Sequence, residues 1–253
     1  MLEFAKKIAV QAGKKHIMAF NRHKFKVNYK SKFNPVTKQD KSVETYLQRS
    51  ISEKYPSHGI IGEEGTSKKG TNGFTWVIDP LDGTINFIRG FPYFTVSIGI
   101  MKNDKPHIGV IYNPVSKELF YAERGEGAFM NNSKIHVSKT FNIGEAYFST
   151  GFRYKRGKGF INPLKKIRTV LEKSMVVRRT GSASMDLCNV AKGTFDGFFM
   201  YDSKKWDVLA GVTIVKEAGG KFDLKDKQRE NNVDVIATNS RLNGQLKKIL
   251  GWT

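Results

Sequence analysis

Apolar side chains recur at helical spacing in two segments near the amino end of the chain. Over residues 2–20 they return every three to five positions, which predicts an amphipathic helix. A second helix is predicted to open at Asp40 and to end before Pro56, with Val43, Leu47 and Ile51 on one face. Both helices therefore need an apolar surface to cover.

The β-rich runs that follow predict such a surface. Short runs at 25–29 and 60–61 precede the segment 67–73, whose Lys, Gly, Ser and Thr residues indicate a mobile surface loop. Four further runs, separated by turn residues, predict an antiparallel sheet over 76–78, 94–100, 108–112 and 119–122. We expect the two early helices to cover one face of this sheet.

The second half of the chain alternates strands and helices. The predicted strands lie at 146–149, 175–177, 195–200 and 233–237, and the predicted helices at 163–171, 182–191, 206–218 and 241–250. This rhythm is typical of an α/β arrangement. We place a boundary within 138–142, which divides the chain into an α+β half, residues 1–140, and an α/β half, residues 141–253. No internal repeat is evident.

Length and composition narrow the class of protein. The 253 residues and 39% hydrophobic content suit an ordinary globular protein. The longest apolar runs, such as 95–101, are far shorter than the roughly 20 residues that span a membrane. The first residues lack the pattern of a signal peptide, so we expect a cytoplasmic protein. Cys188 is the single cysteine, which excludes an internal disulfide and a cysteine-based metal cluster; we expect it to be structural.

The formal charge of +20 is the most unusual bulk property. We interpret it chiefly as a solvated basic surface; steering of polyanionic substrates and contact with nucleic-acid phosphates are the alternatives. The densest basic run is 153–158. Because no helix-turn-helix, zinc finger or RNA-binding motif accompanies the charge, nucleic acid stays an unlikely partner.

The clearest chemical pattern is the run from Val77 to Thr84. A buried strand delivers Asp79, Pro80 forces a turn, and Asp82 follows three residues later. Two carboxylates at a strand end suit hard cations such as Mg²⁺. An acidic turn of no catalytic function has the same composition, so this run alone leaves both interpretations open.

Two more acidic segments favour the metal site. Glu63 and Glu64 end an apolar run, and Asp207 lies at the start of a helix, where an acid can also be a simple cap. If the three segments converge, they form the multi-cation site that phosphoryl transfer needs. The five histidines share no motif spacing, and we expect them at the surface or in the core. An aspartyl-phosphate phosphatase is disfavoured, because its acids are two apart rather than three.

These motifs resemble the inositol monophosphatase family of lithium-sensitive, magnesium-dependent phosphatases. The resemblance rests on residues 62–64, 76–87 and 206–220 and covers nearly the whole chain, including 35–40. It implies a layered α-β-α-β-α sandwich of the type shared with fructose-1,6-bisphosphatase. It also implies a homodimer that hydrolyses a small phosphorylated substrate.

The resemblance also implies residue roles. The metal ligands would be Glu63, Asp79, the carbonyl of Leu81, Asp82 and Asp207, holding two or three Mg²⁺ ions, with Mn²⁺ as a substitute. Glu63 is preferred to Glu64 on the resemblance alone. Thr84, oriented by Asp40, would position and help deprotonate the attacking water, with Glu63 beside it. The amides of Gly83 and Thr84 would receive the phosphate, and the remaining substrate contacts would come from Gly181, Ser182, Ala183, Met200 and Asp207.

Two residues depart from the family pattern. Met200 stands where inositol-specific members carry a glutamate, and it cannot accept hydrogen bonds from ring hydroxyls. Leu209 stands where a small residue is usual. Lys204 and Lys205 are candidates for binding a second anionic group, although solvated charge is the simpler interpretation. The expected substrate is inositol-1-phosphate or a related sugar phosphate; fructose-1,6-bisphosphate, NADP, 3′-phosphoadenosine 5′-phosphate and histidinol phosphate are alternatives. A regulator that binds RNA or protein is the non-enzymatic alternative.

Overall fold

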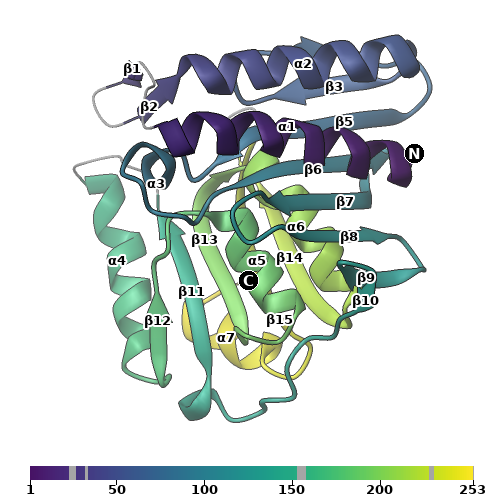
Figure 1. The fold of residues 1–253 in the computed structure, drawn as a ribbon. Coiled ribbons are helices and arrows are strands. Elements are labelled where there is room, and N and C mark those ends of the chain that lie inside the picture. Colours follow the sequence, from purple (N-terminus) through teal and green to yellow (C-terminus); the bar gives the residue numbers. More distant parts are fainter. Residues whose placement is uncertain (23–26, 32–33, 153–157, 228–230, 253) are drawn as a thin grey trace.

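The computed structural model describes residues 1–253 except 23–26, 32–33, 153–157, 228–230 and 253. Helices and sheets stack in five layers (Figure 1), in the order helix pair, eight-stranded sheet, helix pair, five-stranded sheet, helix pair. This confirms the predicted α-β-α-β-α sandwich. Among the described residues, no helix is long and apolar enough to cross a membrane.

The helices follow the predicted spacing closely. They are α1 (Leu2–Arg22), α2 (Lys38–Lys54), α3 (Thr84–Ile88), α4 (Lys158–Leu171), α5 (Ala183–Ala191), α6 (Lys205–Glu217) and α7 (Asn243–Leu250), with a 3₁₀ turn at Ile143–Glu145. Capping explains two of the starts, because Thr37 accepts from the backbone at the opening of α2 and Ser182 does so at the opening of α5. The short α3 was not predicted from the sequence.

The first sheet has the order β10-β9-β8-β7-β6-β5-β3-β4. Its strands are β3 (Gly59–Gly62), β4 (Ser67–Lys68), β5 (Phe74–Asp82), β6 (Thr95–Lys102), β7 (Lys105–Asn113), β8 (Glu118–Glu123), β9 (Gly127–Met130) and β10 (Ser133–Lys134). Helices α1 and α2 cover one face, where Ile8, Leu47, Trp76 and Ile98 belong to one core cluster. The four runs predicted to form an antiparallel sheet, β5 to β8, do pair antiparallel, and β3 joins β5 in parallel.

The second sheet has the order β12-β11-β13-β15-β14. Its strands are β11 (Tyr147–Phe152), β12 (Val176–Arg178), β13 (Gly197–Lys204), β14 (Gly220–Asp226) and β15 (Asn232–Asn239). Helices α5 and α6 pack between the two sheets, and α4 and α7 cover the outer face. A separate hairpin joins β1 (Val27–Ser31) to β2 (Asn34–Thr37).

Several expectations need correction or stay open. The segment 67–73 is not simply a loop, because Ser67 and Lys68 form β4 and pair with β3. Positions 25–26 of the predicted early strand and 153–157 of the basic run lie outside the described residues. The division at residue 140 stays a prediction: the first sheet ends at Lys134 and the second begins at Tyr147, but α5 and α6 pack against both.

Helix α6 is seated directly on the first sheet. A Cβ added at Gly99 of β6 would lie 2.9 Å from a methyl carbon of Leu209, so glycine here makes room for the leucine. Leu209 is buried with Val77 and Met101. The departure from a small residue at 209 is therefore accommodated, and the start of α6 is held beside β5.

Candidate functional site

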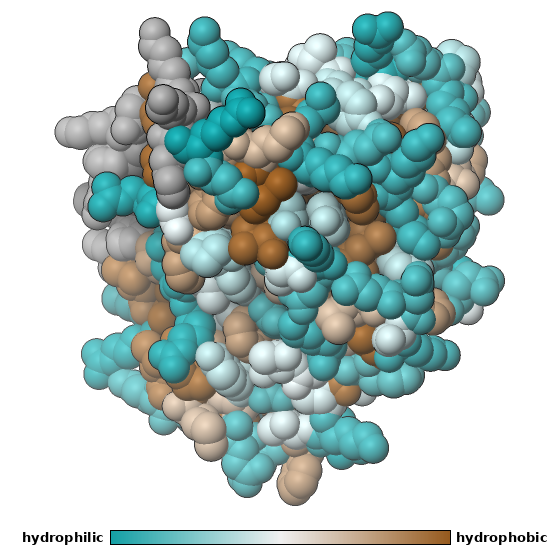
Figure 2. Space-filling model, in the orientation of Figure 1, coloured by the Kyte–Doolittle hydropathy of each residue, from teal (hydrophilic) through white to brown (hydrophobic). Residues whose placement is uncertain are grey.

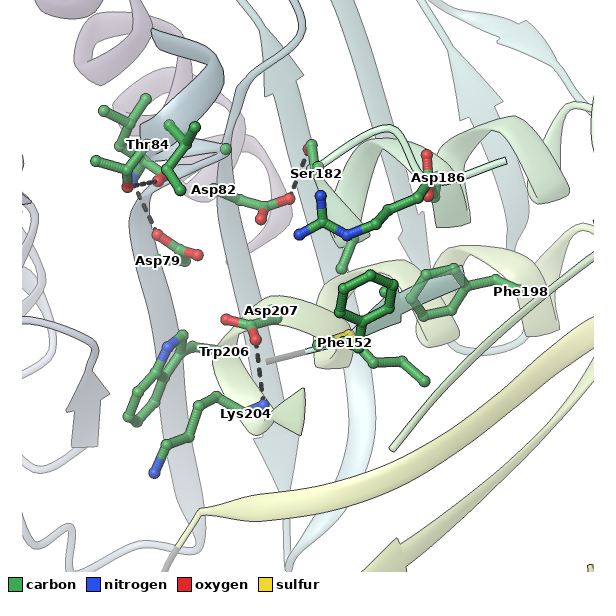
Figure 3. A pocket seen from close by; sticks show the side chains of 18 of the residues that line it. Asp79, Asp82, Thr84, Phe152, Ser182, Asp186, Phe198, Lys204, Trp206 and Asp207 are labelled. Atoms are coloured by element: carbon green, nitrogen blue, oxygen red, sulfur yellow. Dashed lines mark hydrogen bonds between the residues drawn. The ribbon is translucent and has the colours of Figure 1, made fainter. Parts of the chain in front are cut away.

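A pocket of about 290 Å³ lies where the ends of both sheets meet the first turns of α3, α5 and α6. Glu63, Asp79, Asp82 and Asp207 line it, so the structure brings the three acidic segments together. Figure 3 shows Asp79, Asp82 and Asp207 around a shared space. The convergence that the sequence could only suggest is thus present in the fold.

A bulge in β5 explains how Asp79 and Asp82 reach the same space. Side chains three apart on a regular strand point to opposite faces. Here Asp79 pairs with Ser97 and Asp82 with Thr95, so three steps along β5 match two along β6. The extra residue falls at Pro80 and Leu81 and turns both acids into the pocket.

Asp79 is the most deeply buried of the four clustered acids. It is 2% exposed, and its Oδ1 accepts from the Leu81 amide at 2.9 Å. Burial raises the pKa of Asp79 well above its ordinary value, and the nearby charges of Glu63, Asp82 and Asp207 raise it further. A buried carboxylate among like charges is stabilised by a cation placed between them.

Asp82 is held from α5. Its Oδ2 accepts from the Ser182 hydroxyl at 2.6 Å and from the Ser184 amide at 2.8 Å, and it also accepts from the Ser184 hydroxyl. Burial raises the pKa of Asp82, while these donors lower it. Ser182 and Ser184 therefore fix one oxygen of the carboxylate and join the second half of the chain to β5. Ser184 was not singled out from the sequence.

Asp207 occupies the first turn of α6. Its Oδ2 accepts from the Lys204 amide at 3.1 Å and from the Ser203 hydroxyl at 3.2 Å, which is the capping role considered for it. Burial, followed by the charges of Asp82 and Glu63, raises the pKa of Asp207 to about 8. A simple cap needs no such neighbours, so capping is only part of what this acid does.

Glu63 and Glu64 face different partners. The charge of Glu63 raises the pKa values of Asp79 and Asp207. The pKa of Asp40 is raised chiefly by burial, and the charge of Glu64 raises it further. The geometry agrees with the preference for Glu63 in the acid cluster. The loop carrying both is held by Glu44 of α2, an acid that the sequence argument missed.

Glu44 is 3% exposed and points at the turn after β3. Its two carboxylate oxygens accept from the Glu64 amide at 2.7 Å and the Thr66 amide at 3.0 Å. A Cβ at Gly62 would lie within 3 Å of this carboxylate, so glycine is needed for the close approach. Glu44 therefore fixes the position from which Glu63 enters the pocket.

Thr84 opens α3 at the edge of the acid cluster. Gly83 precedes it with φ +93°, a conformation that favours glycine, and this turn brings the first amides of the helix to the pocket. The Thr84 hydroxyl lies 3.4 Å from Asp40 Oδ1 and 3.1 Å from the Leu81 carbonyl oxygen. Asp40 is itself fixed by the Thr37 amide at 2.7 Å. The structure thus brings Thr84 and Asp40 together, as expected.

One histidine lies directly behind the site. His16 is fully buried in α1, and its Nε2 is 2.6 Å from the Pro80 carbonyl oxygen. Because a carbonyl only accepts, Nε2 carries the proton and donates. Burial lowers the pKa of His16 to about 4, so the ring is neutral at physiological pH. It supports the bulge from the core, in line with the expectation of surface or core histidines.

The other end of the pocket is different in character. It is lined by the side chains or backbone of Thr150, Gly151, Phe152, Arg179, Phe198 and Met200. Figure 3 shows Phe152 and Phe198 displaced from Asp79, on the far side of Asp207. Gly181, Ser182 and Ala183 also line the pocket, and Met200 is 9% exposed. The predicted substrate-contact residues therefore all line this one pocket.

Lys204 and Lys205, considered together as an anion site, have different surroundings. Lys204 lines the pocket and its ammonium lies 5.2 Å from the centroid of the Trp206 ring. Lys205 forms an ion pair with Asp226 at 2.9 Å. The two lysines therefore do not form one anion site. Hydrophilic side chains cover most of the face seen in Figure 2, which suits a solvated charged surface.

The oxygen atoms of the acid cluster are of the type that binds magnesium. Carboxylate oxygens are the ligands that Mg²⁺ and Mn²⁺ prefer, and the Leu81 carbonyl lies beside them in the same pocket. Among the described residues, however, no three acidic, histidine or cysteine side chains form a closed cage as they stand. In Asp82 and Asp207, one carboxylate oxygen is held by a serine hydroxyl and a backbone amide.

Comparison with known proteins gives a family match over almost the whole chain. The sequence model of the inositol monophosphatase family matches residues 1–250. An inositol monophosphatase of Mesembryanthemum crystallinum is 40% identical, over 85% of this chain and 83% of its own. A Nus factor SuhB of Pasteurella multocida is 38% identical, over 87% of this chain and 83% of its own.

Solved structures give the same answer. The extragenic suppressor protein SuhB of Bartonella henselae superposes with a TM-score of 0.90 at 33% identity, covering 99% of this chain and 98% of its own. The inositol monophosphatase of Anabaena superposes with a TM-score of 0.87 at 34% identity, covering 99% and 94%. The chain belongs to the inositol monophosphatase family.

Proposed function

We propose that this chain is a magnesium-dependent phosphomonoesterase that hydrolyses a small phosphate ester by attack of water. The observation that carries the proposal is the meeting of Glu63, Asp79, Asp82 and Asp207 in one pocket beside Thr84. The membership of the phosphatase family and the enzyme names of its relatives support it.

Each acid has a place in this mechanism. Glu63, Asp79 and the Leu81 carbonyl would hold one Mg²⁺, and Asp79, Asp82 and Asp207 a second, with Glu63 contributing to a weaker third. Magnesium there would acidify water and neutralise the phosphate charge. Asp79 would be the ligand shared by the first two ions, and the charges of all three other acids act on it.

Thr84 would orient the attacking water. Its hydroxyl donates toward Asp40 or the Leu81 carbonyl, which leaves the oxygen lone pairs to accept a hydrogen bond from the attacking water. Asp40 is 1% exposed and held by Thr37, so it fixes the direction of that hydroxyl. The amides of Gly83 and Thr84, at the start of α3, would receive the phosphate oxygens.

Release of inorganic phosphate tests the proposal. The substrates are inositol-1-phosphate and the alternative esters, each assayed with Mg²⁺, Mn²⁺ or a chelator. We expect Mg²⁺-dependent release and at least a ~100-fold loss in Asp79→Asn, because a ligand shared by two ions is removed. Asp226→Asn is the matched control, since that acid lies at the surface beside Lys205. Equal phosphate release by wild type and Asp79→Asn would refute the proposal, and inositol-1-phosphate turning over slowest would exclude it as the preferred substrate.

A regulatory role is the second candidate. The +20 charge and the similarity to proteins named Nus factor SuhB favour it. RNA binding that weakens steeply with salt and persists in Asp207→Asn would establish a second role without removing the first. No salt-dependent binding would dismiss it.

A further inference from the structure

Among the residues that the structure describes, the pocket end remote from the acid cluster contains few groups that suit a polyol. Phe152, Phe198 and Met200 supply apolar surface there. The Thr150 hydroxyl is engaged with the Phe199 carbonyl at 2.7 Å. A ring bearing several hydroxyls would bury them without acceptors, which costs binding free energy.

One carboxylate lines this end among the described residues, and it is already occupied. Asp186 is 1% exposed, and its Oδ1 accepts from the Tyr93 hydroxyl at 2.9 Å and from the Thr180 hydroxyl at 2.5 Å. Burial raises the pKa of Asp186 to about 7, which reduces its negative charge at neutral pH. It therefore opposes an anionic ligand less than an exposed aspartate does.

Arg179 supplies positive charge at the same end. Its guanidinium carbon lies 4.4 Å from the centroid of the Phe152 ring, and both residues line the pocket. A guanidinium packed on an aromatic face is held in place, and the planar fork of a guanidinium matches the geometry of a carboxylate or phosphate. The neighbouring Arg178 lies instead over Tyr147 and is not among the pocket-lining residues.

We propose that Arg179, set on Phe152, binds a second anionic group on the alcohol part of the substrate, so that the enzyme prefers phosphate esters with such a group to phosphate esters of uncharged polyols. This inference rests on the proposed phosphatase function and names its substrate class. Met200 adds to the preference, because a thioether neither repels the anion nor accepts from a hydroxyl. The overall positive charge also favours capture of such substrates.

Matched substrates test the proposal. 2-Phosphoglycerate and glycerol 2-phosphate differ only in a carboxylate against a hydroxymethyl group. Fructose-1,6-bisphosphate and fructose 1-phosphate differ in a second phosphate. The measured quantity is the ratio of kcat/KM within each pair, with Mg²⁺. We expect wild type to prefer the member with the additional carboxylate or phosphate by at least about tenfold in one pair or both, since that group gains charge-assisted hydrogen bonds from the guanidinium.

The variants assign that preference to one residue. Arg179→Gln should bring the ratio to about 1, Arg179→Lys should retain part of it, and Arg178→Gln should leave it at the wild-type value. A wild-type ratio near 1 in both pairs, or a preference that survives Arg179→Gln, would overturn the inference while phosphate release still supports the phosphatase. Absence of hydrolysis of all four esters, with release of phosphate from inositol-1-phosphate, would overturn the inference alone; absence of release from every ester of both panels would overturn the phosphatase proposal as well.

Discussion

Replacing Glu44 by glutamine is predicted to weaken both the fold and the metal site. Glu44 is buried and accepts from two backbone amides, of Glu64 and Thr66. A glutamine offers one acceptor oxygen, so its amide nitrogen must face the second N–H. Loss of one hydrogen bond to a charged group costs about 1.5–3 kcal/mol, and two donors face to face leave a buried polar group unsatisfied. We therefore expect the free energy of unfolding to fall by about 2–3 kcal/mol.

Urea unfolding of metal-free protein measures the first effect, and the Mg²⁺ concentration for half-maximal phosphate release measures the second. We expect that concentration to rise at least about fivefold, on the order of 1 kcal/mol, because the loop carrying Glu63 loses its anchor. Glu53→Gln is the control on the same helix. Its side chain is 64% exposed and pairs only with Arg49 at the surface, so about 0.5 kcal/mol or less is expected. A change below 0.5 kcal/mol in Glu44→Gln, with unaltered Mg²⁺ dependence, would refute the reasoning.

Three further substitutions probe separate parts of the account. Thr84→Val, which removes the hydroxyl beside Asp40, should lower kcat by about 10²–10³ with little change in unfolding, whereas Thr84→Ser should retain most activity; equal rates would dismiss the role. His16 has a folded pKa of about 4 against about 6.5 unfolded, so the unfolded state binds more protons between them and stability is lost as pH falls from 6.5 to 4. Wild type should therefore lose up to about 3 kcal/mol more than His16→Gln over that range in urea unfolding, and parallel pH profiles would contradict this. Leu209→Ala should cost about 2–4 kcal/mol in the same assay, because the methyls against β6 leave a cavity, and a cost under 1 kcal/mol would show that the helix settles closer.

The sequence predicted the layers better than the details that position the chemistry. Helical and strand periodicity placed α1, α2 and most strands of both sheets, because apolar faces of regular elements have a fixed repeat, whereas β9, β10 and β14 were not predicted. The bulge at Pro80 and the β4 strand were missed, since each depends on pairing with a partner distant in sequence.

The acids themselves were predictable, and their support was not. Glu63, Asp79 and Asp207 stand in recognisable motifs. Glu44 and Ser184 have none: they matter because folding brings them to groups 20 and 102 positions away. The one signal available was the position of Glu44, which follows Val43 and stands three residues before Leu47, beside the apolar face of the helix. A carboxylate at such a position is seldom buried without partners.

Location of bound Mn²⁺ by anomalous diffraction tests the central claim most directly. Crystals grown with Mn²⁺ should show at least two anomalous peaks among the carboxylates of Glu63, Asp79, Asp82 and Asp207, each with oxygens about 2.1–2.3 Å away. Crystals in which these four side chains point apart and no peak lies between them would contradict the account.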